Sequence, residues 1–138
     1  VRHAISGLDE HATRLRELQE YLVSAITSAV PEAIFNGPPP GEIRLPNNTH
    51  FSFPGCEGDS LLMLLDAAGI DCSTGSACTA GIPEPSHVLL SMGVDEKTAR
   101  ASLRFSLGRD SSKEGIDHLA QALPGVFERA KRAGSVAK

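Results

Sequence analysis

The stretch Ser73-Thr74-Gly75-Ser76-Ala77-Cys78-Thr79-Ala80-Gly81 separates two regions with regular helix and strand patterns. Every residue in it except Cys78 is Ser, Thr, Gly or Ala, and Pro83 and Pro85 follow closely. Such a segment buries little apolar surface and loses much backbone entropy when it is held rigid. We therefore expect residues 73–85 to form a mobile surface loop that carries one thiol between two anchored elements.

Before this loop, the pattern predicts two helices and two strands. Apolar residues at spacings of three and four predict a long amphipathic helix that starts at Leu8 and ends before Pro31. A Gly- and Pro-rich turn and loop is expected at residues 35–41. A buried helix should be closed by Gly69 in the left-handed conformation. The helices are expected over residues 8–29 and 59–68, and the strands over residues 42–45 and 48–53.

After the loop, the pattern predicts two short helices, a strand and a long helix. These are expected over residues 86–92, 95–100, 102–107 and 111–132, followed by a frayed tail over 133–138. Gly93 should end the first helix and Asp95 should cap the second. A capping box of Ser111 and Glu114 is expected to start the last helix, which Pro124 should kink or restart.

Together these elements predict one α+β domain over residues 1–138, with a small antiparallel or mixed sheet covered on one face by helices. The chain is 41% hydrophobic and 22% charged, which is typical of a globular protein. A net charge of −4 gives no reason to expect nucleic-acid binding, and no apolar run is long enough to span a membrane. Because the chain starts with Val1, we expect it to be cut or processed from a longer protein.

Three cysteines make an odd count, which favours a reducing, cytoplasmic setting over a secreted disulfide scaffold. Cys56 and Cys72 are interpreted as small buried hydrophobes. A zinc site built from the three cysteines with His50 or His87 is disfavoured, since the cysteine spacings fit no usual ligand pair. Cys72 could instead form a disulfide or a persulfide relay with Cys78, which lies six residues further on.

One charged residue lies on a predicted strand in a position that suits ligand binding. Polar and apolar residues alternate along the predicted strand from Ser102 to Leu107. Arg104 and the two serines should therefore share its polar face, opposite the apolar residues. A guanidinium among small serines has room for a bidentate carboxylate partner, although a structural salt bridge fits the pattern equally well. His50 and His87 are interpreted mainly as structural residues, with His87 the stronger candidate for a place near an active centre.

Three motifs in this chain resemble the NifS/IscS-type cysteine desulfurases of the class V aminotransferase family. The loop residues 73–80 resemble the active-site loop of that family. The runs PSHVLLSMG at residues 85–93 and ASLRFSLGR at residues 101–109 resemble the segments that follow it, in the same order. The resemblance covers essentially the whole chain. It implies the carboxy-terminal small domain of a fold-type I pyridoxal-phosphate enzyme.

The resemblance implies an activity and a role for two residues. Such enzymes take sulfur from L-cysteine, leave L-alanine and store the sulfur as a persulfide for an iron–sulfur scaffold or another acceptor protein. It implies that Cys78 is the sulfur-accepting nucleophile, that Arg104 binds the substrate carboxylate, and that a persulfide on Cys78 could ligate a nascent cluster during transfer. Relatives are homodimers.

The motifs that hold pyridoxal phosphate in this family, including the cofactor lysine, are missing from the chain. We therefore expect the isolated chain to bind no cofactor and to turn over no cysteine. Two other classes of function remain open. A stand-alone persulfide carrier would use Cys78 but would not need Arg104, whereas a pure interaction or dimerisation domain would have an ordinary, slowly reacting thiol.

Overall fold

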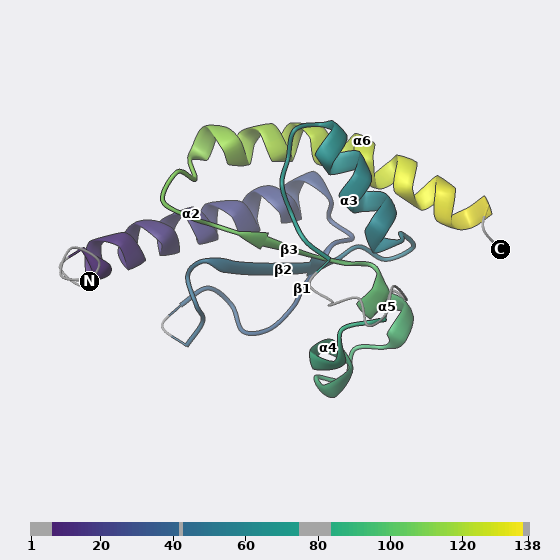
Figure 1. Ribbon diagram of the computed structural model, residues 1–138, viewed down its shortest axis with the longest axis horizontal. Helices are drawn as coiled ribbons and strands as arrows, with labels where there is room; N and C mark the ends of the chain where they lie inside the picture. The colour runs from purple at the N-terminus through teal and green to yellow at the C-terminus, as the bar shows by residue number, and fades with distance from the viewer. Residues whose placement is uncertain (1–6, 42, 75–83, 137–138) are drawn as a thin grey trace.

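The computed structural model describes residues 7–41, 43–74 and 84–136 (Figure 1). Three antiparallel strands form a small sheet in the order β1-β2-β3. The predicted α+β class with helices against a small sheet is confirmed. The elements in chain order are α2 (Leu8–Ala29), β1 (Ile34–Phe35), β2 (Asn48–Ser52), α3 (Gly58–Ala67), α4 (His87–Ser91), α5 (Glu96–Arg100), β3 (Ser102–Ser106) and α6 (Lys113–Val136).

The pairing of β2 with β3 decides which side chains face the helices. Phe51 lies opposite Leu103, and Thr49 lies opposite Phe105, so these pairs form the core face of the sheet. Phe51 and Leu103 are fully buried. Because side chains alternate along a strand, the residues between them point to the opposite face. We call that opposite face the polar face; it carries Asn48, His50, Ser52, Ser102, Arg104 and Ser106.

The long helices α2 and α6 lie side by side against the core face and run in the same direction (Figure 1). Tyr21 Oη donates to Asp117 Oδ1 at 2.5 Å near the middle of α2. The ion pair between Lys131 and Glu32, at 2.7 Å, joins the far end of α6 to the residues that follow α2. Apolar residues of α2, α3 and α6 pack with the core face of the sheet and form the core; they include Leu22, Ile26, Leu61, Leu65, Leu123 and Phe127.

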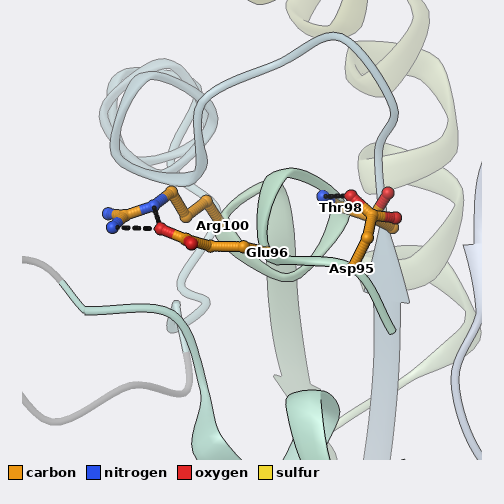
Figure 2. Close-up of polar contacts among 4 residues, drawn as sticks. All are labelled: Asp95, Glu96, Thr98 and Arg100. Carbon is orange, nitrogen blue, oxygen red and sulfur yellow. Dashed lines mark hydrogen bonds and ion pairs between the residues drawn. The ribbon is translucent and has the colours of Figure 1, made fainter. Parts of the chain in front are cut away.

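Several helix ends have the predicted local chemistry. Gly69 and Gly93 adopt φ values of +75° and +85°, which favour glycine, just after α3 and α4. Figure 2 shows α5, where Asp95 caps the helix by accepting the Thr98 amide N–H at 3.0 Å. The α4 helix begins after Ser86, whose hydroxyl accepts the Leu89 amide.

Other expectations about local structure were wrong. The described part of residues 42–45 forms a turn and a bend, because Pro46 follows and no strand pairs with it. A strand instead forms at Ile34–Phe35, where pairing with β2 stabilises it. Phe53 lies beyond the end of β2, although it is fully buried and its amide donates to the Ala101 carbonyl. Leu8, expected on the apolar stripe of the first helix, is exposed.

The last helix also differs from its prediction. Ser112 caps it by accepting the Gly115 amide at 3.2 Å, whereas the Ser111 hydroxyl accepts the Gly108 amide, so the expected box with Glu114 does not form. Pro124 lies inside one continuous helix and does not restart it. The helix extends to Val136, through most of the predicted frayed tail. Among the described helices, none combines the length and the apolar character that crossing a membrane requires.

Candidate functional site

The predicted reactive loop lies largely outside the described residues, and Cys78 lies outside them with Gly75, Ser76, Ala77, Thr79 and Gly81. The two ends of the loop are described, however. Ser73 and Thr74 precede the gap, and Glu84 follows it. The flanks therefore show where the loop leaves the domain and where it returns.

The loop leaves the domain at the edge of β3, directly beside Arg104. The Ser73 amide donates to the Arg104 carbonyl at 3.1 Å, and the Arg104 amide donates to the Ser73 carbonyl at 2.6 Å. These two bonds form an isolated antiparallel bridge on the side of β3 that β2 leaves free. Five residues of extended chain reach at most about 17 Å. The length of the chain therefore keeps Cys78 within about that distance of Ser73, which the bridge holds beside Arg104.

The Arg104 side chain is exposed on the polar face. The two ion pairs found among the described residues join Arg100 to Glu96 and Lys131 to Glu32, and neither involves Arg104. The structural salt bridge that the sequence left open therefore does not form within the described part of the chain. A guanidinium in this situation can bind a planar carboxylate through two parallel N–H groups.

A hydrogen-bonded row of polar groups lies beside Arg104 and crosses the sheet. Asn36 Nδ2 lies 3.1 Å from His50 Nδ1 and donates to Ser52 Oγ at 2.8 Å. Ser52 Oγ lies 2.7 Å from Ser102 Oγ, and Ser102 Oγ donates to the Thr98 carbonyl at 3.0 Å. Ser52 and Ser102 are almost completely buried, so this end of the polar face is covered.

His50 lies directly opposite Arg104 in the register of β2 and β3. Burial lowers the pKa of His50, and the charges of Arg44 and Arg104 lower it further. His50 is therefore neutral at pH 7, because its pKa falls below its usual value of about 6.5. His50 is thus a cross-strand neighbour of Arg104, whereas His87 is exposed on α4.

Arg44 stabilises the connection between β1 and β2. Its guanidinium donates to the carbonyls of Asn36 at 2.9 Å and Asn48 at 3.0 Å, and it lies 4.4 Å from the ring centre of Phe35. Gly37 has a φ of +90°, and a Cβ atom there would lie 2.7 Å from Arg44 Nη1. This connection fixes Asn36 and thereby one end of the polar row.

Both described ends of the loop line one small pocket. Thr74 and Glu84 lie there with Gly58 and Arg100. Arg100 also pairs with Glu96 on the exposed side of α5, as Figure 2 shows. The base of the loop is thus anchored between the start of α3 and the end of α5.

The two other cysteines are poor candidates for chemistry. Cys56 is buried against the Phe127 carbonyl, and Cys72 is partly buried beside Leu62 and Met63. Burial raises the pKa of each thiol to about 11, so both are protonated at neutral pH. Within the described ranges, no three His, Cys, Asp or Glu side chains are grouped as metal ligands would be.

Sequence reasoning missed most of the polar row. Asn36 was expected in a turn, Ser102 was noted only as a polar residue of an alternating strand, and Ser52 lies in the predicted strand 48–53 without an assigned role. The one available signal was the small size of the two serines at equivalent positions of two strands. Their contact depends on strand register, which alternation does not specify.

Comparison with known proteins supports the interpretation of the motifs. The model of the aminotransferase class-V family matches residues 3–119. An IscS-like cysteine desulfurase of Mycobacterium tuberculosis is 52% identical over 134 residues, and a cysteine desulfurase IscS of Clostridium botulinum is 43% identical over 131 residues. These matches cover 97% and 95% of this chain but only 34% and 33% of the relatives.

Two solved structures match this chain over a similar share of its length. A NifS-like protein of Rickettsia africae has a TM-score of 0.74 and 26% identity, covering 89% of this chain and 31% of the other. A second NifS-like protein has a TM-score of 0.74 and 30% identity, covering 91% and 30%. The chain thus spans about a third of the length of the curated relatives it matches. By its sequence and its fold, the chain belongs to the aminotransferase class-V family.

Proposed function

We propose that this chain is the carboxy-terminal small domain of a cysteine desulfurase. In this proposal, Arg104 binds the α-carboxylate of L-cysteine and Cys78 accepts its sulfur. The observation that carries the proposal is the backbone bridge between Ser73 and Arg104. It ties the start of the cysteine loop to the strand that bears an exposed guanidinium with no ion-pair partner among the described residues.

The proposed reaction balances as follows. The Cys78 thiolate attacks the sulfur of L-cysteine, so an S–S bond forms and the bond between sulfur and Cβ breaks. The carbon keeps the electron pair and takes up a proton, which gives L-alanine and a Cys78 persulfide. Arg104 orients the substrate by its carboxylate, and the loop keeps the thiolate within reach of the substrate sulfur.

Pyridoxal phosphate, when bound, would stabilise the electron pair that this bond cleavage leaves on carbon. The described residues of this chain do not fit that cofactor by themselves. Lys113 and Lys131 lie on α6, where they contact Tyr21 and Glu32, and Lys97 is an exposed residue of α5. This chain spans about a third of the length of the relatives that it matches. We therefore assign cofactor binding to the part of the complete protein that lies outside this chain.

The proposal also includes the sulfur acceptor, the oligomeric state and the cellular compartment. The persulfide sulfur would pass to an iron–sulfur scaffold or another acceptor protein, and the complete enzyme would be a homodimer in the reducing environment of the cytoplasm. A stand-alone persulfide carrier is disfavoured, because a carrier that never binds free cysteine has no use for the exposed guanidinium of Arg104.

The test uses the complete protein that contains this chain, with three forms compared for alanine production from L-cysteine. We expect Cys78→Ala to abolish alanine production. We expect Arg104→Ala to raise the KM for L-cysteine by at least tenfold, because a charge-assisted bidentate contact is lost. Alanine production that is independent of Cys78 would refute the proposed function. An unchanged KM in Arg104→Ala would refute the assignment of Arg104.

A further inference from the structure

We propose that His50 is a second recognition residue for the substrate carboxylate, and that its Nε2–H group donates to the carboxylate beside Arg104. This inference rests on the proposed function, since it assumes that the carboxylate binds at Arg104. It adds a residue from β2 to a site that the motifs place entirely on β3 and the loop.

The position of His50 follows from strand register and strand order. His50 and Arg104 are directly paired residues of β2 and β3, so their side chains leave the same face of the sheet as immediate neighbours. Asn36 approaches His50 from the other side, because β1 pairs with the opposite edge of β2. The ring nitrogen Nδ1 is bonded to Asn36 on the β1 side of the ring, and from this we infer that the other edge, which carries Cδ2 and Nε2, faces β3.

The polar row fixes which ring nitrogen carries the proton. The Thr98 carbonyl can only accept, so the Ser102 hydroxyl donates to it. Ser52 must then donate its own proton to Ser102 Oγ, and its oxygen accepts from Asn36 Nδ2. Asn36 therefore presents its second N–H to His50 Nδ1, which accepts it. The neutral ring holds its proton on Nε2, where it is a donor.

The charge of the neighbours keeps this donor neutral. Arg44 and Arg104 are the charged groups that act on His50, and both oppose a third positive charge, as does burial of the ring. A neutral N–H next to a guanidinium recognises a carboxylate without adding a second cation. A carboxylate side chain at position 50 would pair with Arg104 and compete with the substrate carboxylate. The neutral imidazole of His50 does not compete in this way.

The test measures alanine formation by the complete protein with matched variants at position 50. We expect His50→Leu to raise the KM for L-cysteine about five- to tenfold with kcat within about twofold, because one hydrogen bond to a charged acceptor is lost. We expect His50→Asn to stay within about twofold of the native KM, since its amide can accept from Asn36 and still donate. His11→Ala, on α2, serves as a control for removal of an imidazole elsewhere.

A second readout separates recognition from a purely structural role. L-alanine and L-alaninamide are compared as competitive inhibitors, because only the former carries a carboxylate. We expect His50→Leu to weaken inhibition by L-alanine about five- to tenfold and to leave inhibition by L-alaninamide unchanged. Equal weakening of both, or an unchanged KM in His50→Leu while Arg104→Ala raises it, would overturn the role of His50 and leave the proposed function intact. If Arg104→Ala also leaves KM unchanged, the carboxylate site itself is refuted.

Discussion

Replacement of Gly58 by alanine tests how the base of the loop is built. Gly58 is the buried first residue of α3, where the helix meets the turn between α5 and β3. A Cβ atom there would lie 2.7 Å from the Arg100 carbonyl oxygen and 3.5 Å from Thr74 Cγ2. Real Cβ atoms essentially never lie within 3.0 Å of another heavy atom, so the surrounding structure would have to shift. Because the carbonyl belongs to the backbone, it cannot rotate away as a flexible side chain can.

The expected cost follows from this overlap. Overpacking of a buried site typically costs about 1–3 kcal/mol, and we take about 2 kcal/mol for Gly58→Ala. The unfolding entropy of a 138-residue chain is about 0.3 kcal/mol/K. The variant should therefore melt about 7 °C below the native chain.

The assay is thermal unfolding followed by circular dichroism, with Gly125→Ala as the matched control. Gly125 lies inside α6, and a Cβ atom there meets nothing within 4 Å. Alanine should stabilise this position by up to about 1 kcal/mol, because glycine is the poorer helix former. The two identical substitutions should thus shift the melting temperature in opposite directions. A Gly58→Ala chain that melts at or above the native temperature would refute the close packing described here.

Three further outcomes follow from burial and charge. Leu103→Ala should lower the free energy of unfolding by about 2–5 kcal/mol in urea titrations, because the side chain is fully buried; a loss below about 1 kcal/mol would contradict its place in the core. Cys56 and Cys72, with pKa values of about 11, should resist iodoacetamide at pH 8 and react faster as the pH approaches 11. Rapid labelling of either at pH 8 would argue against their burial. Hydrogen bonds to its carboxylate lower the pKa of Asp95, so its stabilising effect is present above its usual pKa and is lost as the pH falls through the lowered value. The difference in melting temperature between the native chain and Asp95→Ala should therefore shrink in acid, and a difference independent of pH would rule out this explanation.

The parts of the fold that sequence predicted well depend on local chemistry. The helix α2 follows from the spacing of its apolar residues, and Gly69, Gly93 and Asp95 mark helix ends through their own conformation or side chain. Arg104 was correctly placed on a polar face because alternation along a single strand is sufficient for that prediction.

The parts that sequence could not predict depend on contacts between distant segments. The strand at Ile34–Phe35 has two residues, and it is a strand only because β2 pairs with it. Gln19 lies fully buried on the apolar side of α2, because its amide donates to the carbonyls of Leu45 and Asn48. The bridge between Ser73 and Arg104 joins residues 31 positions apart, and no local pattern indicates it.

The central claim is that Cys78 receives the sulfur of L-cysteine, and direct mapping of that sulfur tests it most directly. The complete protein would be incubated with L-cysteine carrying a heavy sulfur isotope, alkylated, digested and analysed by mass spectrometry. Assignment of the sulfur to single residues from the fragment spectra should place it on Cys78 and none on Cys56, which is buried, or on Cys72, which is partly buried; these two thiols serve as internal controls. Heavy sulfur on Cys56 or Cys72, or on none of the three, would contradict the account.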